Sequence, residues 1–325
     1  KIISIDQKGQ LYQKWIEKVS FDAKADVSGA CIHFYTNQQQ FAKPWKENWF
    51  EMPKEIRAHG KIFAIKTGKK NAQPLELYDP LSRTVFFFDC DYYGWIKSAA
   101  LALTGDILED NHYIFSIHGA LLDVNGKGIA ILGPPGAGKT TTSYGLLRYN
   151  GVKLISDDWH FFNFINGKTI GYDSEKNTYI RADIAKNWKE YQRFVKAARF
   201  DNRGRAVFDL REVIGSENVT TKTTIGTVIL LRRGSSFPVI EAASTAKALE
   251  YLEGIGYGNP HMLQNGKWKR DVRRKAYTML MDNADTYILN TTETPQQSLS
   301  RICKILGLEE KVKKFFAEIE KVIAG

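Results

Sequence analysis

The sequence predicts an α/β protein with a smaller mixed α+β domain at its N-terminal end. From Tyr113 onward, short apolar runs of strand length alternate with stretches of helical periodicity, the pattern of a sheet covered by helices. Before that point, short alternating runs are separated by clusters of Asn, Gln, Gly and Pro. We therefore expect a mixed α+β domain of unassigned role over 1–105 and an α/β domain over 106–325.

The composition predicts an ordinary globular chain. Its 325 residues are 43% hydrophobic and 25% charged, which is enough to bury a sizeable core. No apolar run approaches the roughly 18 to 20 residues of a membrane span, and the first residues hold no apolar signal core. Cys31, Cys90 and Cys303 lie far apart without metal-site spacing, so neither a disulfide framework nor a zinc site is expected. We expect a cytoplasmic protein with no membrane partner.

The formal net charge of +10 predicts affinity for anionic partners. The densest basic stretch is "KWKRDVRRK", residues 267–275. The simplest interpretation of this stretch is a solvated helix face, and a phosphate-directed role is the alternative. No zinc-finger or RNA-recognition signature accompanies it, so the sequence does not predict a nucleic-acid partner.

In the N-terminal domain, the runs "ACIHFYT", "GKIFAIKTG" and "TVFFFD" predict three strands. The stretch 91–110 then changes to helical periodicity. Its expected apolar face consists of Trp95, Ile96, Ala99, Ala100 and Leu103. We expect this helix to join the two domains.

In the second domain, "YIFSIHGALLDV", "GIAILG" and "VKLISDD" predict strands, with a helix after Lys139. A helix is expected over 182–198, with a buried stripe of Ile184, Trp188, Tyr191 and Val195. A pair of C-terminal helices begins near Thr294, where Pro295 and Gln297 complete an N-cap with a capping box. We expect the aromatic run 159–162 to pack against the sheet.

The stretch "ILGPPGAGKTTTSYGLL", 131–147, fits the phosphate-binding pattern G-x-x-x-x-G-K-[ST] between an apolar strand and a helix. Glycines let the backbone wrap closely around an anion, and the helix N-terminus adds positive partial charge. Pro134 and Pro135 have no N–H, so the backbone donors must come from about 136–141. The residues expected to bind nucleotide are Gly133, Gly136, Ala137, Gly138, Lys139, Thr140 and Thr141.

Two adjacent acids follow the next strand. Asp157 and Asp158 lie at the carboxyl end of "VKLIS", the end at which open α/β sheets bind ligands. Two carboxylates that face a polyphosphate need a cation, so we expect Mg²⁺ with Thr140 and one of the acids as ligands. The other carboxylate would be free to accept a proton from an attacking hydroxyl. A helix N-cap or turn acid would explain one of these aspartates but not both.

With these motifs in order, the chain resembles the catalytic domain of HPr kinase/phosphorylase, of the phosphoenolpyruvate carboxykinase-like P-loop type. The resemblance lies in "IHGALLDVNGKGIAILGPPGAGKT", "LISDDW" and "RGRAVFDLREVIG", which together fall within 115–235. It departs from the family at Arg205 and Ala206, where an apolar residue and a second glycine are usual, and the "PGRN" segment is not recognisable. The phosphoryl acceptor is therefore left open.

The resemblance implies an ATP-binding, Mg²⁺-dependent kinase fold and a role for each matched residue. Asp157 would be the base, Asp158 would hold the metal with Thr140, and Lys139 would contact the outer phosphates. His118 would lie beside the transferring phosphoryl, and Arg203 would neutralise charge there. The resembling family forms symmetric assemblies, which raises the question of a homo-oligomer.

Three functions agree with these residues. The first is a kinase that transfers phosphoryl from ATP or another phosphate donor to a hydroxyl of a metabolite or of a protein or peptide serine. The second is a non-catalytic nucleotide switch or slow NTPase, because the same loop would bind nucleotide in either case. The third is a carboxykinase-type enzyme, which would need further metal ligands and a carboxylate-binding arginine set upstream that the sequence does not show.

Overall fold

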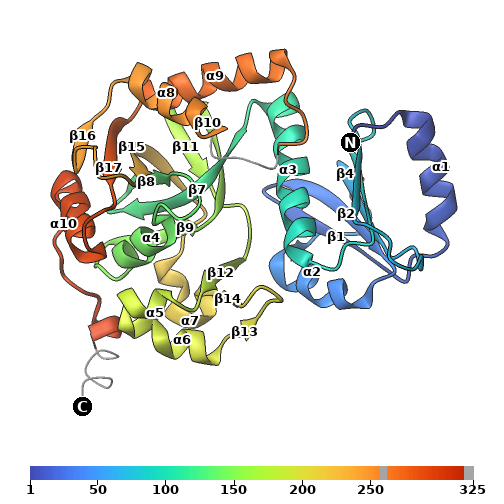
Figure 1. Cartoon of the computed structure of the whole chain (residues 1–325), viewed down its shortest axis with the longest axis horizontal. Coiled ribbons are helices and arrows are strands. Elements are labelled where there is room, and N and C mark those ends of the chain that lie inside the picture. Colours follow the sequence, from blue (N-terminus) through green and yellow to red (C-terminus); the bar gives the residue numbers. More distant parts are fainter. Residues whose placement is uncertain (257–261, 318–325) are drawn as a thin grey trace. The chain divides into compact units, whose positions relative to one another are not determined.

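The computed structural model describes residues 1–256 and 262–317. The chain forms two compact units, one of which is built from 1–114 together with Ser174–Lys176 and 262–265. The remaining described residues, from Phe115 onward, form the second unit. Both units contain a mixed sheet with helices on its faces, so the predicted mixed α/β character is confirmed (Figure 1).

A six-stranded sheet in the order β3-β1-β2-β4-β6-β5 forms the centre of the N-terminal unit. Strands β2, β4 and β6 are parallel to one another, and they coincide with the three predicted strands. The elements in chain order are α1 (Ile5–Ile16), β1 (Phe21–Val27), β2 (Ala30–Thr36), α2 (Ala42–Asn48), β3 (Phe50–Glu51), β4 (Gly60–Ile65), β5 (Leu75–Asp79), β6 (Thr84–Phe88) and α3 (Tyr93–His112).

Helices α1 and α3 cover opposite faces of this sheet (Figure 1). On the α1 face, Trp15 packs with Tyr35, Phe63, Phe86 and further apolar side chains of the strands. On the other face α3 approaches so closely that a Cβ on Gly60 would lie 2.8 Å from the Leu103 side chain, which explains the glycine at the start of β4.

Helix α3 confirms the helix predicted over 91–110, with one correction. Its burial extends around most of its circumference instead of forming one stripe. Trp95, predicted on the apolar face, is 44% exposed, whereas Ile96, Ala99, Ala100 and Leu103 are buried. The predicted face was therefore wrong at Trp95, because periodicity alone does not distinguish a stripe from an almost fully buried helix.

The second unit has an eight-stranded sheet in the order β11-β10-β7-β8-β15-β17-β16, with β9 paired to β7. Strands β8, β15 and β17 are parallel, and β11 also pairs with the start of the long β15, which closes β7, β8, β15, β11 and β10 into a ring. The strands are β7 (Phe115–Val124), β8 (Lys127–Leu132), β9 (Val152–Ser156), β10 (Trp159–Ile165), β11 (Lys168–Tyr172), β15 (Lys222–Arg232), β16 (Ile240–Ala242) and β17 (Asp285–Asn290).

Helices pack on both sides of this sheet. Helices α4 (Lys139–Leu147) and α10 (Pro295–Leu306) contribute to one apolar core with alternate residues of the strands. Helices α8 (Thr245–Gly254) and α9 (Lys267–Asp282) contribute to the other. The predicted strands "YIFSIHGALLDV", "GIAILG" and "VKLISDD" correspond to β7, β8 and β9, and the cap of α10 forms as predicted, with Thr294 accepting from the Gln297 N–H.

The single helix predicted over 182–198 was wrong. The segment consists of α5 (Ile184–Asn187), a 3-10 turn (Lys189–Tyr191) and α6 (Gln192–Ala197). Trp188 interrupts the helical conformation with φ −131° and ψ 93°. The predicted stripe residues are all buried nevertheless, because each short piece turns its apolar side chains inward.

A separate three-stranded sheet, β12-β14-β13, flanks this segment. It consists of β12 (Asn177–Arg181), β13 (Arg199–Phe200) and β14 (Arg205–Asp209). Helix α7 (Leu210–Ile214) follows β14 directly, with the Asp209 side chain accepting from the Arg211 N–H at the N-cap.

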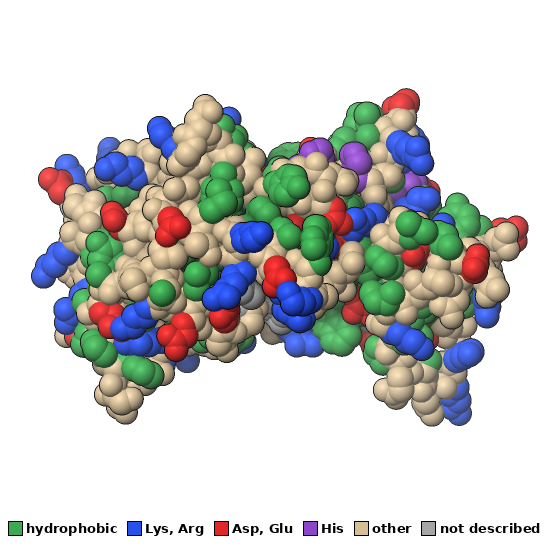
Figure 2. Space-filling model, turned by 90° about the horizontal axis from the view of Figure 1, so that it is seen from above, with side chains coloured by type: hydrophobic (Ala, Val, Ile, Leu, Met, Phe, Trp, Pro, Cys, Tyr) green, Lys and Arg blue, Asp and Glu red, His purple; other side chains and the backbone are tan. Residues whose placement is uncertain are grey.

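The basic stretch 267–275 lies on α9. Trp268 is 64% exposed, but the side chains of Lys269 and Arg273 are buried, so only part of the stretch forms the predicted solvated face. On the face of the molecule in Figure 2, Lys and Arg side chains are interleaved with Asp and Glu.

Among the described residues, no helix combines the length and apolar character needed to cross a membrane. The three cysteines are buried free thiols.

Candidate active site

The glycine-rich loop leaves β8 and enters α4, as its motif predicts. Gly136 and Gly138 have φ of +81° and +99°, in the left-handed region that favours glycine. A Cβ on Gly133 would lie 2.6 Å from the carbonyl oxygen of Leu231 on β15, so the side chain is excluded by the neighbouring strand. Each of these glycines is therefore required by backbone geometry.

Two side chains from distant segments hold the loop. The Thr291 hydroxyl, just after β17, donates to the Ala137 carbonyl at 2.9 Å and also lies 3.2 Å from the Arg232 carbonyl. The Trp188 indole N–H donates to the Thr141 carbonyl at 2.9 Å. No sequence motif points to Thr291 as a positioning residue, and its place at the carboxyl end of a parallel strand is the one signal of its role.

The loop and the start of α4 offer hydrogen-bond donors and positive charge. The first backbone N–H groups of a helix have no partner within it, which applies here to Lys139, Thr140 and Thr141. The Lys139 ammonium donates to the carbonyls of Gly133 at 2.7 Å and Pro134 at 3.3 Å. Burial lowers the pKa of Lys139, and the negative charge of Asp158 opposes this shift. The arrangement suits a phosphate group at the helix N-terminus.

The two predicted acids differ in exposure and in partners. Asp157 is 7% exposed and accepts a hydrogen bond from the Tyr144 hydroxyl of α4 at 3.2 Å. The Asp158 side chain is 39% exposed, and its Oδ1 lies 2.8 Å from Nε2 of His118. His118 reaches this position because β7 pairs with β10 in a register that sets His118 opposite Trp159. The structure thus brings His118, Asp157 and Asp158 to the end of β9, beside α4.

The aromatic run after the acids packs as predicted. The side chains of Trp159, His160, Phe161 and Phe162 are all buried. His160 Nδ1 lies 2.9 Å from the Gly119 carbonyl, so Nδ1 carries the proton. Burial lowers the pKa of His160 to about 4, which keeps this ring neutral near pH 7.

Arg203 lies on a different part of the unit. It occupies the exposed turn between β13 and β14, where its backbone N–H donates to Asp201 at 2.9 Å. Arg205 pairs with the same aspartate and lies over the Tyr179 ring, while Ala206 is buried on β14. The two departures from the family signature therefore belong to the three-stranded sheet, and the predicted proximity of Arg203 to the phosphoryl remains a prediction.

The donor set suits Mg²⁺ bound together with a polyphosphate. Thr140 offers a hydroxyl and Asp158 a partly exposed carboxylate, both oxygen ligands of the kind Mg²⁺ prefers. Within 1–256 and 262–317, no cluster of three or more His, Cys, Asp or Glu side chains has the arrangement of a metal site. A magnesium ion here would rely on one protein carboxylate, phosphate oxygens and water, which is its usual mode of binding.

Comparison with known proteins identifies distant relatives. No protein-family model matches the chain. HPr kinase/phosphorylase of Clostridium tetani (strain Massachusetts / E88) is 30% identical over 117 residues, which are 36% of this chain and 32% of that protein. The protein of the same name from Lachnoclostridium phytofermentans is 31% identical over 116 residues, 36% of this chain and 31% of that protein. The one from Clostridium acetobutylicum is 28% identical over 154 residues, 45% of this chain and 44% of that protein.

The chain thus spans between 31% and 44% of the length of these curated relatives. Among solved structures, the HPr(Ser) kinase/phosphatase from Coxiella burnetii aligns with a TM-score of 0.34 and 15% identity, covering 59% of this chain and 97% of that chain. The resemblance predicted from the sequence is confirmed by the curated relatives: over 36% to 45% of its length, the chain is a distant relative of HPr kinase/phosphorylase.

Proposed function

We propose that this chain is a Mg²⁺-dependent phosphotransferase that moves the terminal phosphoryl of a nucleotide to a hydroxyl group. The acceptor would be a small metabolite or a serine of a protein or peptide. The observation that carries the proposal is the placement of two adjacent carboxylates, one paired with His118, at the end of the strand beside the P-loop helix. The kinase names of the curated relatives agree with it.

The donor would bind through the loop. Backbone N–H groups from Gly136 to Thr141 would donate to the phosphates, and the Lys139 ammonium would exchange its carbonyl partners for an outer phosphate oxygen. Thr140 and Asp158 would hold Mg²⁺, whose charge would offset that of the phosphate oxygens. Because His118 and Asp158 are hydrogen-bonded, His118 would fix the direction of that carboxylate.

Transfer then requires only alignment and removal of one proton. Asp157 would accept the proton of the acceptor hydroxyl as its oxygen forms a bond to the terminal phosphorus. The bond from that phosphorus to the bridging oxygen breaks, and the electron pair leaves with the nucleotide. The Tyr144 hydroxyl donates to Asp157 and would hold this carboxylate in position.

Substitutions of Lys139 and Asp157 test the roles proposed for these two side chains. Lys139→Met should abolish detectable transfer, and Asp157→Asn should lower kcat by about 100-fold or more, the usual contribution of a general base. Nucleotide binding should weaken in Lys139→Met but persist in Asp157→Asn. The assay follows phosphorylated products by mass spectrometry with metabolite mixtures and serine peptides under several phosphate donors.

Matched controls are Lys127→Met at the exposed start of β8 and Asp183→Asn before α5, both of which should retain full activity. Full activity of the Lys139 and Asp157 variants would refute the proposal. Slow hydrolysis that no metabolite or peptide accelerates would instead identify a nucleotide switch or slow NTPase.

A further inference from the structure

A cavity of about 670 Å³ lies in the N-terminal unit, apart from the phosphate-binding loop. It opens where the α1 face of the sheet changes from apolar to basic. The residues Lys24, His33 and Lys61 are direct neighbours on β1, β2 and β4. Direct cross-strand neighbours have Cβ atoms about 5 Å apart, so three basic side chains share one row on one face of the sheet.

The lining of the cavity is strongly basic. Its basic residues are Lys24, His33, Arg57, His59, Lys61 and Arg83. None of the lining residues, which all lie within the described range 24–83, is Asp or Glu. Burial lowers the pKa of the central His33, and the Asp22 carboxylate pairs with its ring, so the ammonium groups of Lys24 and Lys61 on either side are the positive charges of this row.

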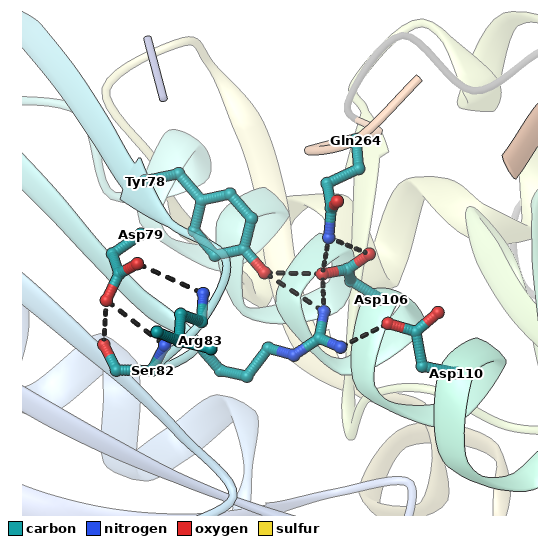
Figure 3. A network of polar contacts seen from close by, with 8 residues as sticks. Tyr78, Asp79, Ser82, Arg83, Asp106, Asp110 and Gln264 are labelled. Carbon is teal, nitrogen blue, oxygen red and sulfur yellow. Dashed lines mark hydrogen bonds and ion pairs between the residues drawn. The ribbon is translucent and has the colours of Figure 1, made fainter. Parts of the chain in front are cut away.

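The cations of the cavity differ in their partners. Arg83 is committed to Asp106 and Asp110, and Figure 3 shows its guanidinium between these carboxylates and the Tyr78 hydroxyl. Among the described residues, by contrast, neither Arg57 nor Lys61 forms an ion pair with a carboxylate. Burial lowers the pKa of Lys61, and the positive charges of Lys8 and Arg57 lower it further.

Hydrogen bonds hold the neighbouring polar groups in place. Lys24 donates to the carbonyls of Lys54 and Ile56, which holds the segment before Arg57 against the sheet. His59 Nδ1 accepts the Cys31 backbone N–H at 2.8 Å, so the neutral ring carries its proton on Nε2. His33 is held between Asp22 and the Tyr35 hydroxyl. The cavity therefore presents positive charge from Lys61 on β4 and from Arg57, which lies with His59 in the segment that precedes β4.

We propose that this cavity is a binding site for a small molecule that carries a phosphate group, with Arg57 and Lys61 as its principal charge partners and His59 as a donor. Guanidinium and ammonium groups are the usual partners of phosphate oxygens. The volume exceeds that of a single phosphate and lies in the range of about 300–1,000 Å³ typical of small-molecule sites. The site is independent of the proposed phosphotransferase function.

Inorganic pyrophosphate is the probe, and isothermal titration calorimetry on the full chain is the measurement. The parent protein should bind it at two sites, the phosphate-binding loop and the cavity. Arg57→Gln/Lys61→Gln should lose the cavity site, with affinity there at least tenfold weaker, while Lys139→Met should weaken only the loop site. The control is Lys69→Gln/Lys70→Gln, which removes the same charge from exposed positions of the same unit.

Unchanged pyrophosphate affinity at the cavity in Arg57→Gln/Lys61→Gln would overturn the proposal. An equal loss of affinity in Lys69→Gln/Lys70→Gln would do the same. So would succinate binding to the cavity as tightly as pyrophosphate does. If the double variant does not fold, the site can be tested in the unaltered chain by protection of lysine side chains from acylation. Pyrophosphate should shield Lys61 of the unaltered chain from acylation, as read by peptide mass mapping, while Lys70 stays reactive. Equal reactivity of Lys61 with and without pyrophosphate would also reject the site.

Discussion

At the scale of single residues, Asp157 and Asp158 show how adjacent side chains acquire different environments. Asp157 turns inward, where it meets the hydroxyl of the fully buried Tyr144, while Asp158 turns to the partly exposed His118. A buried carboxylate needs hydrogen-bond partners, and the Tyr144 hydroxyl is one of the partners of Asp157. Tyr144 is thus a positioning residue for the proposed base.

Tyr144→Phe tests this role. A hydrogen bond to a charged group contributes about 1.5–3 kcal/mol, which corresponds to a loss in kcat of about tenfold or more, with little change in KM for nucleotide. The control is Tyr191→Phe, which removes another buried hydroxyl that donates to the Tyr144 carbonyl at 2.9 Å and leaves the acids untouched. Steady-state kinetics with equal losses in both variants would contradict the role.

His160 makes stability depend on pH. Its pKa is lowered from 6.5 to about 4 in the folded chain, because burial disfavours the charged ring. The unfolded chain therefore binds the proton more tightly, and stability falls as pH decreases from about 6.5 to about 4, by about 3 kcal/mol in total.

His160→Asn keeps a donor for the Gly119 carbonyl but does not titrate. The drop in the urea midpoint between pH 7.5 and pH 4.5 should therefore be smaller in the variant than in the parent. An identical drop would show that His160 is not responsible.

At the scale of elements, the sequence predicted the strands whose apolar residues form compact runs. Strands β2, β4, β6, β7, β8 and β9 were predictable because compact apolar runs end at glycine or polar residues. The segment 182–198 was not, because a period of buried side chains does not reveal where the backbone breaks. Trp188 leaves the helical conformation there and donates its indole N–H to Thr141.

The candidate site was predictable where its residues belong to a local motif or to the end of a predicted strand. Lys139, Asp157 and Asp158 follow from strand ends and a local motif, so their grouping could be read from the sequence. The contact between His118 and Asp158 depends on the pairing of β7 with β10, a nonlocal register. Thr291 and the closure of β11 onto β15 likewise arise from pairings that no local pattern encodes.

The N-terminal cap of α10 should contribute measurably to stability. The Thr294 side chain accepts from the Gln297 N–H, and Gln297 accepts from the Thr294 N–H at 3.1 Å. Thr294→Ala should lower the free energy of unfolding of the C-terminal unit by about 1 kcal/mol, while Thr294→Ser should preserve it. Urea denaturation of the two variants checks this, and equal stability of Ala and Ser variants would contradict it.

At the scale of the whole molecule, the N-terminal unit includes two short segments from later in the chain, residues 174–176 and 262–265. Glu175 forms an ion pair with Lys97 of α3 at 2.8 Å, and both side chains are almost fully buried. Gln264 donates to Asp106 of the same helix at 2.8 Å (Figure 3). Part of what stabilises the first unit is therefore encoded after the second has begun.

Glu175→Gln measures this contribution. It would remove the carboxylate that pairs with the buried Lys97 ammonium, and breaking a buried ion pair typically costs about 3–5 kcal/mol. Calorimetry should show the transition of the N-terminal unit shifted to lower temperature, and Lys97→Met/Glu175→Leu should recover most of the loss. An unshifted transition in Glu175→Gln would mean that the pair contributes little.

The inclusion of residues 174–176 and 262–265 in the N-terminal unit affects how such a protein can evolve. A recombination event with one breakpoint near residue 114 would transfer a first unit without Glu175 and Gln264, which are partners of Lys97 and Asp106. Exchange would succeed only if three separate stretches of the gene moved together. The two units should therefore be inherited together. Phylogenetic trees built separately from the sequences of each unit should have the same branching order.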